Sequence, residues 1–245
     1  MNTFTYLFLG VVFLSIAVQL LLTRRHVSHI LRHRDAVPEA FNGKIPLDAH
    51  QKAADYTQAK VKTGLYEYIL GIIFLLIWTL GGALQLLDSA WRSLGLAEIW
   101  TGLGFLLSIY AIMEILDLPM SAYRTFGLEQ RFGFNRSTPK IFVTDLCKNI
   151  VLVLLIGTPM ILFVLWIMKS AGNLWWFYVW LTWLGFSLLM MWAYPAFIAP
   201  LFNKFRPLEN DELRTCIESL LTRNGFTSNG IFVMDGSSRS THGNA

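Results

Sequence analysis

Long blocks of apolar residues alternate with shorter polar segments along the 245-residue chain. Five of these blocks are close to or above the ~20 residues that a helix needs to cross ~30 Å of hydrocarbon. They cover residues 4–22, 66–87, 96–118, 146–168 and 174–199. Pro159 lies inside the fourth block, where its ring and missing N–H predict a kink. The pattern therefore predicts an all-α polytopic membrane protein with five transmembrane helices, formed by residues 1–199.

The polar segments between the blocks differ in charge, and this difference predicts an orientation. Basic residues gather in loops 23–65 and 119–144 and in the C-terminal tail, whereas the two other loops carry one each. Because basic loops stay in the cytoplasm, we expect the N-terminus outside and the tail in the cytoplasm. The membrane would be the inner or plasma membrane of a bacterium, or the endoplasmic reticulum of a eukaryote. The net charge of +4 lies in these loops, so it favours the lipid bilayer, and not nucleic acid, as a partner.

The tail, residues 200–245, has the pattern of a small mixed segment. Asn210 is a good N-cap for a helix, Gly225 is a natural stop, and residues 231–234 form an apolar run typical of a strand. One helix and one strand cannot bury enough surface to fold alone. We therefore expect residues 200–245 to be the truncated start of a cytoplasmic α/β domain, which further polypeptide would complete.

Three histidines at spacings of three and four residues, His26, His29 and His33, could share one helical face. Four arginines surround them, and a positive field opposes binding of a metal cation. Contact of this segment with anionic lipid headgroups is the interpretation that we prefer.

A second polar group near the C-terminus contains Asp235, Ser237, Ser238, Ser240 and His242. These residue types make up hydrolase triads, but triads are usually assembled from distant positions in the chain. Residues packed this closely in sequence more often form turn hydrogen bonds, and no nucleophile-elbow pattern surrounds the serines.

Carboxylates at the ends of the apolar blocks leave two interpretations open. Glu67, Glu114 and Asp117 could face a cavity or an ionic partner, or they could simply extend to the membrane surface. Asp145 and Lys148, three residues apart, are predicted to form a local ion pair.

Three unusual sequence blocks carry a family resemblance. They are Y-R-T-F-G-L-E-Q-R-F-G-F-N-R-S-T at 123–138, P-L-F-N-K-F at 200–205 and M-D-G-S-S-R-S-T-H-G-N-A at 234–245. With the spacing of the apolar blocks, they resemble the N-terminal region of the CAAX prenyl endopeptidases, which are integral-membrane zinc metalloproteases. The resemblance covers nearly the whole chain.

This resemblance implies a chamber enclosed by seven membrane helices, and a zinc cofactor held by His-Glu-x-x-His and a downstream Glu. No His-Glu pair occurs in this sequence, so we assign no catalytic or metal-binding residue and expect the 245-residue chain to be inactive alone. The family pattern places the zinc ligands beyond Ala245. It also implies that Asn244 and Ala245 begin a strand that binds extended substrate by β-strand addition. Glu129 and residues 132–135 would be scaffold, seating their loop against the protease domain.

The leading functional hypothesis is thus the membrane portion of a zinc endopeptidase that cleaves peptides or membrane proteins at the cytoplasmic face. Its substrates would be prenylated CAAX-type peptides if the source organism makes them. The alternative is a non-catalytic membrane scaffold or a truncated pseudo-protease. A small transporter is disfavoured because the two halves show no repeat and no matching interrupted spans.

Overall fold

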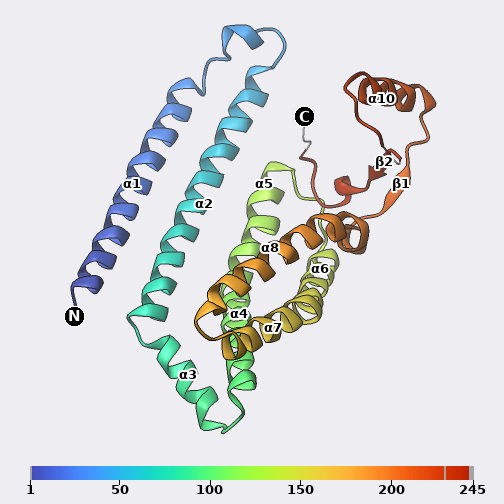
Figure 1. Ribbon diagram of the computed structural model, residues 1–245. Coiled ribbons are helices and arrows are strands. Elements are labelled where there is room, and N and C mark those ends of the chain that lie inside the picture. Colours follow the sequence, from blue (N-terminus) through green and yellow to red (C-terminus); the bar gives the residue numbers. More distant parts are fainter. Residues whose placement is uncertain (1, 229, 243–245) are drawn as a thin grey trace. The chain divides into compact units, whose positions relative to one another are not determined.

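Five long helical stretches coincide with the five predicted apolar blocks in the computed structural model, which describes residues 2–228 and 230–242 (Figure 1). Only the end of the second block belongs to a separate helix. The helical stretches cover residues 3–33, 47–79, 98–132, 139–170 and 172–202, and within the described residues these five are long and apolar enough to cross a membrane. This confirms the predicted fold class. Most of the helices extend well beyond the apolar blocks, because a polar sequence outside the hydrocarbon can continue a helix that the apolar part has started.

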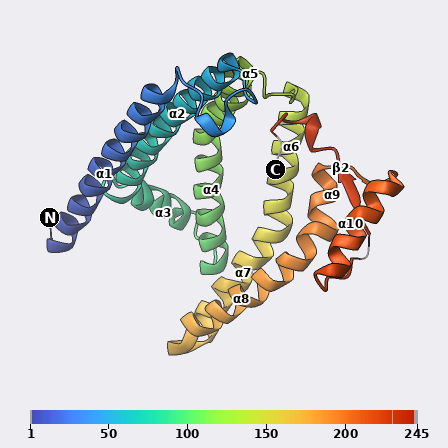
Figure 2. The ribbon, with the colours of Figure 1, turned by 90° about the horizontal axis from the view of Figure 1, so that it is seen from above.

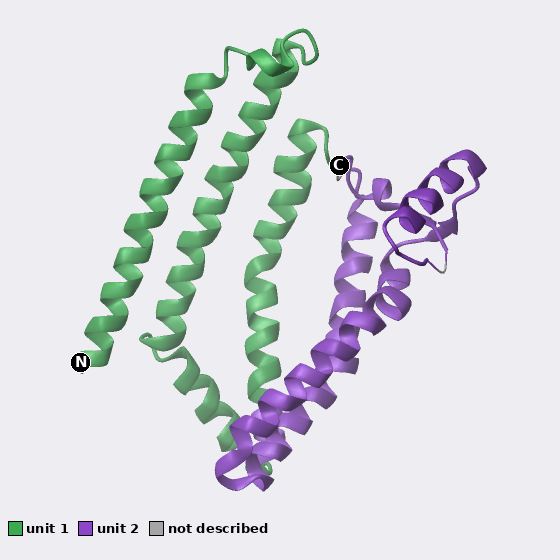
Figure 3. Cartoon of the chain, turned by 45° about the horizontal axis from the view of Figure 1, so that its top comes forward, with its two compact units in different colours: residues 1–97, 104–135 green, residues 98–103, 136–245 purple. Residues whose placement is uncertain are grey.

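The chain divides into two compact units (Figure 3). Unit 1 comprises residues 1–97 and 104–135, and unit 2 comprises residues 98–103 and 136–245. The division that we predict at residues 199/200 concerns membrane and cytoplasmic parts, and it stays a prediction.

Unit 1 is built around two long helices, α1 (Thr3–His33) and α2 (Leu47–Thr79). They lie side by side and run in opposite directions (Figures 1 and 2). The other elements of unit 1 are η1 (Glu39–Phe41), α3 (Ala83–Ser93), most of α4 (Glu98–Ala122), the π-helical segment η2 (Tyr123–Glu129) and α5 (Gln130–Phe132). Ser15 and Tyr68 share a hydroxyl hydrogen bond of 2.7 Å between α1 and α2.

Helix α3 is an element that the apolar pattern does not predict. The predicted second span continues to residue 87, but α2 ends at Thr79 and α3 begins after Gly82. The indole N–H of Trp91 in α3 donates to the hydroxyl of Ser108 in α4 at 3.0 Å. Gly104 makes this approach possible, because a Cβ there would lie 2.4 Å from the Trp91 ring. Helix α3 is therefore fixed by its packing on α4, which a hydropathy pattern does not contain.

Unit 2 contains two further long helical stretches. The first consists of α6 (Pro139–Leu152), η3 (Val153–Gly157) and α7 (Thr158–Ser170). After η4 (Gly172–Leu174), the second consists of α8 (Trp175–Ala193), η5 (Tyr194–Ile198) and α9 (Ala199–Phe202). Helices α7 and α8 lie side by side (Figure 2).

Proline residues inside the long helices are accompanied by π-helical turns. Pro159 lies two residues after the end of η3, Pro195 lies within η5, and Pro119 lies one turn before η2. A proline removes one helical N–H and its ring crowds the preceding turn. The helix can adapt to such a local disturbance by a single π-helical turn. The structure has the π turn η3 just before Pro159, whereas the kink predicted at Pro159 stays a prediction.

The tail forms a helix beside a two-stranded sheet. Helix α10 (Asp211–Arg223) begins where predicted, with the Asn210 side chain accepting from the Leu213 N–H at 2.9 Å. The predicted strand is present as β2 (Phe232–Met234). It pairs antiparallel with β1 (Phe205–Pro207), a strand that the sequence pattern does not predict. The 3-10 turn η6 (Gly236–Ser238) follows β2.

Large apolar side chains are mostly exposed, as the surface of a membrane protein requires. Within the described residues only Leu103, Leu128, Phe132 and Ile167 are buried apolar side chains. The tryptophans that open α8, Trp175, Trp176, Trp180 and Trp183, are exposed, in agreement with a membrane-anchoring role.

Candidate functional site

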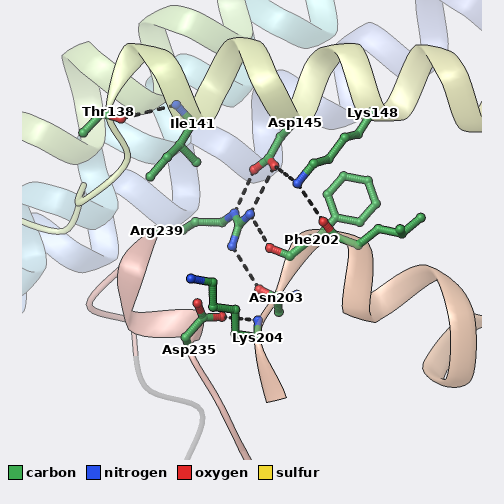
Figure 4. A network of polar contacts seen from close by, with 10 residues as sticks. Thr138, Ile141, Asp145, Lys148, Phe202, Asn203, Lys204, Asp235 and Arg239 are labelled. Carbon is green, nitrogen blue, oxygen red and sulfur yellow. Dashed lines mark hydrogen bonds and ion pairs between the residues drawn. The ribbon is translucent and has the colours of Figure 1, made fainter. Parts of the chain in front are cut away.

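A cluster of polar contacts around Arg239 holds the tail against the membrane helices of unit 2 (Figure 4). Arg239 follows η6 and reaches the side chain of Asp145 on α6. Its Nε and Nη2 atoms donate to the two carboxylate oxygens of Asp145 at 2.8 and 3.1 Å. Such a two-pronged arginine–carboxylate contact fixes direction as well as distance. The pair joins residues that are 94 positions apart in sequence.

The same guanidinium also binds the end of α9. Nη1 donates to Asn203 Oδ1 at 3.0 Å, and Nη2 donates to the backbone carbonyl of Phe202. We call Asp145, Phe202, Asn203 and Arg239 the Arg239 cluster. The hydrogen bonds to Asp145 raise the pKa of Arg239 above its ordinary value; partial burial opposes this rise, and the charge of Asp145 adds to it. Arg239 is therefore a permanently charged centre onto which α6, α9 and the tail converge.

Backbone contacts extend the cluster in two directions. Asp235 accepts from the Lys204 N–H through Oδ1 at 2.7 Å, and its own N–H donates to the Lys204 carbonyl at 3.1 Å. The Arg136 N–H donates to the Arg239 carbonyl at 3.1 Å. The segment is thus anchored at Asp235 and at the backbone of Arg239, in addition to the contacts of the guanidinium.

Lys148 ties α9 to α6 beside the cluster. Its Nζ atom donates to the Leu201 carbonyl at 2.7 Å and lies 5.6 Å from the centre of the Phe202 ring. It also lies 3.9 Å from Asp145, so the predicted local ion pair is present. The shorter contacts of Asp145 are to Arg239, however, and local spacing does not predict them.

In unit 1, the F-G-F-N block forms a turn that packs on Tyr56 of α2. The N–H groups of Phe134 and Asn135 both donate to the Glu129 carbonyl, and Gly133 takes a positive φ of 81° to close the turn. The Tyr56 hydroxyl donates to Glu129 Oε1 at 2.6 Å, and its ring contacts those of Phe132 and Phe134. These contacts agree with a scaffold role, while the seating of this loop on a protease domain stays a prediction.

Two of the carboxylates at the membrane ends have an ionic partner. Arg124 Nε lies 3.0 Å from Glu67 Oε1, and Arg124 Nη2 lies 3.5 Å from Asp117 Oδ2. For Glu67 and Asp117, pairing is therefore the interpretation that the structure favours over simple extension to the surface.

Several of the remaining sequence candidates form hydrogen bonds with backbone or side-chain atoms near them in the structure. His33 Nδ1 lies 2.8 Å from the His29 carbonyl, and His50 Nε2 lies 2.8 Å from the His33 carbonyl. Asp235 and Ser238 take part in the turn of η6, and the His242 N–H donates to the Ser240 hydroxyl at 3.1 Å. Asn244 and Ala245, the predicted substrate-binding residues, lie outside the described residues.

The implied zinc does not fit the described side chains. Across residues 2–228 and 230–242, no three His, Cys, Asp or Glu side chains are placed to hold a metal ion. We therefore derive no chemical step through zinc from these residues. Both oxygens of Asp145, the carboxylate of the Arg239 cluster, accept hydrogen bonds from Arg239, so the role that this cluster's geometry supports is to position a segment.

Arg239, Asn203 and Tyr56 were not predicted as site residues. The available signal was that Asn203 and Arg239 each fall in one of the unusual blocks, 200–205 and 234–245. The hydrogen-bond partners of these two residues, however, are distant in sequence and cannot be predicted from spacing.

Comparison with known proteins adds the family. Residues 26–204 match the family described as CAAX prenyl protease N-terminal, five membrane helices. CAAX prenyl protease 1 of Saccharomyces cerevisiae is 33% identical over 221 residues, which are 85% of this chain and 48% of that protein. The CAAX prenyl protease 1 homolog of Arabidopsis thaliana is 41% identical over 148 residues, 60% of this chain and 35% of that one.

The crystal structure of S. mikatae Ste24p superposes with a TM-score of 0.85 at 31% identity, covering 95% of this chain and 55% of that structure. The chain therefore spans about half of the length of such relatives or less. The match over residues 26–204 and the likeness of the fold agree with the motif blocks at 123–138 and 200–205. The chain is an integral membrane protein that belongs to the CAAX prenyl protease N-terminal family.

Proposed function

We propose that this chain is the membrane-spanning N-terminal part of a zinc-dependent endopeptidase that acts on prenylated CAAX-type peptides at the cytoplasmic membrane face. The observation that carries the proposal is the family match over residues 26–204, with relatives that are named CAAX prenyl proteases. In this proposal the zinc ligands come from polypeptide outside this sequence. Zinc would supply an activated water for peptide hydrolysis when bound.

The role that we assign to this chain's own residues is positioning. The Arg239 cluster holds the backbone just before residues 243–245 to α6 and α9. If Asn244 and Ala245 pair with an extended substrate backbone, their register depends on how firmly residues 235–242 are seated. This arrangement supports a role of the Arg239 cluster in fixing the start of a substrate-binding strand.

The test uses the full-length protein purified from its own membrane. We expect its intact mass to exceed the 27.9 kDa of this chain. We also expect it to cleave a farnesylated CAAX peptide faster than the same peptide without the lipid, and a zinc chelator to abolish cleavage. The 245-residue chain alone should neither cleave the peptide nor bind zinc stoichiometrically. A native product of 27.9 kDa without peptidase activity would favour the scaffold or pseudo-protease alternative instead.

A further inference from the structure

A cavity of about 510 Å³ lies in unit 1, between α2 and the segment formed by η2 and α5. Its lining includes Thr63, Leu128 and Phe132, which are 6%, 5% and 8% exposed and are among the few buried side chains of the described residues. The Thr63 hydroxyl is satisfied by the Ala59 carbonyl at 3.0 Å. The cavity therefore has a firm, packed floor and is more than a gap between loose side chains.

The lining carries an excess of positive charge. Lys62 and Arg131 both line the cavity, and neither forms an ion pair with a carboxylate in the part of the chain that the structure describes. Asp55, the acidic side chain of the lining, is held by Arg34, whose Nε and Nη2 donate to its two oxygens at 2.8 and 2.9 Å. The charge of Arg131 also acts on Asp55, but this carboxylate is already bound by Arg34. The two cations of the lining therefore outweigh its one carboxylate, and the charge left over favours an anion.

The place of the cavity along α2 indicates what kind of anion it meets. Charged residues occur throughout the first part of the helix and end at Glu67, after which the sequence is apolar up to Trp78. Lys62 and Thr63 thus lie just before the apolar part, at the level where lipid headgroups meet hydrocarbon. Tyr66 and Tyr123, which also line the cavity and are 64% and 55% exposed, suit the same amphipathic boundary.

We propose that this cavity binds the phosphate headgroup of an anionic membrane lipid. Lys62 and Arg131 contact the phosphate, and the two tyrosine rings border the glycerol and the first carbons of the acyl chains. Gly127 keeps this side open, since a Cβ there would lie 2.9 Å from the Tyr123 ring. The site is independent of the proposed peptidase activity.

The test measures lipid bound to the full-length protein by native mass spectrometry, after reconstitution into phosphatidylcholine nanodiscs with or without phosphatidic acid. We expect phosphatidic acid to remain bound preferentially to the wild type. Lys62→Gln and Arg131→Gln should each weaken binding about fivefold, the size expected for one cation at an anionic surface. Lys62→Arg should bind like the wild type.

Lys60→Gln is the matched control, because Lys60 is two residues away on α2, does not line the cavity and lies over the Tyr56 ring at 5.9 Å. It should bind phosphatidic acid like the wild type. Thermal unfolding in phosphatidylcholine alone shows whether each variant folds.

Competition with glycerol 3-phosphate separates the two sources of phosphate. Little competition supports a lipid site, whereas complete displacement at equal concentration would overturn it in favour of a free-anion site. Equal retention of phosphatidylcholine and phosphatidic acid, or equal losses in Lys60→Gln and Lys62→Gln, would also overturn the proposal.

Discussion

Arg239 offers its guanidinium to acceptors from two distant parts of the chain, Asp145 on α6 and the end of α9. Its side chain is 28% exposed and that of Asp145 is 25% exposed, so water screens the pair only in part. We expect Arg239→Ala to lower the free energy of unfolding by about 2 kcal/mol, because it leaves a half-buried carboxylate without its main partner. Arg239→Lys keeps the positive charge but cannot form the two-pronged contact with Asp145. Its free energy of unfolding should therefore lie between those of Arg239→Ala and the wild type.

Thermal unfolding and limited proteolysis of residues 203–242 measure this effect. Arg214→Ala is the control, since the Arg214–Glu218 pair is exposed and should contribute little. An Arg239→Ala protein as stable and as protease-resistant as Arg214→Ala would show that the Arg239 cluster does not anchor the tail.

Tyr56 stabilises unit 1 in two ways, through the hydrogen bond of its hydroxyl to Glu129 and through packing of its ring on Phe132 and Phe134. Two substitutions separate these contributions. Tyr56→Phe removes only the hydrogen bond and should cost about 1 kcal/mol. Tyr56→Ala also removes the ring and should cost about 3 kcal/mol or more. Chemical unfolding in detergent compares both with Tyr6→Phe, a change at an exposed ring. Equal effects of Tyr56→Phe and Tyr6→Phe on the free energy of unfolding would show that the hydrogen bond to Glu129 does not stabilise the protein.

At single residues, the sequence predicts contacts that depend on local spacing. The Asp145–Lys148 pair and the Asn210 cap are of this kind, and both are present. The Arg239–Asp145 contact depends on where the chain returns after 94 residues. No periodic pattern in the sequence indicates that residue 239 comes back to α6, so the main contact of the site could not be predicted.

Among the elements, the long helices follow from hydropathy, whereas α3 and β1 depend on a neighbour. Helix α3 is a short amphipathic segment whose Trp91 packs on α4 at Gly104. Strand β1 is three residues long and exists through its register with β2. Tertiary contacts of this sort outweigh local propensity in short segments.

The close approach of Trp91 to Gly104 gives a test at this scale. Gly104→Ala should destabilise the protein by about 1–3 kcal/mol, because the added methyl group overlaps the indole ring and displaces its bond to Ser108. Gly71→Ala, where a Cβ meets nothing within 4 Å, should be neutral or stabilising. Thermal unfolding compares the stabilities of the two variants. A Gly104→Ala protein as stable as Gly71→Ala would contradict the packing of α3 on α4.

For the whole molecule, the charge pattern predicts that loops at the two ends of the helices lie on opposite sides of the membrane. Both native cysteines, Cys147 and Cys216, are free and exposed. In a Cys147→Ser background we expect a membrane-impermeant maleimide to label Cys216 from the cytoplasmic side only. In a Cys147→Ser, Cys216→Ser background, Asn173→Cys should be labelled only from the opposite side. Labelling of both positions from one side would refute the predicted orientation.

The sequence separation within the Arg239 cluster has a consequence for how the protein is made. At translation rates of about 5–20 residues per second, Arg239 emerges on the order of ten seconds after Asp145. During that interval Lys148, 3.9 Å from Asp145 in the finished protein, is the cation nearest in sequence. The newly made α6 would thus carry only this local ion pair while it enters the bilayer. Arrival of Arg239 would then add a two-pronged partner to Asp145, so that joining the tail to α6 is a late step of biogenesis.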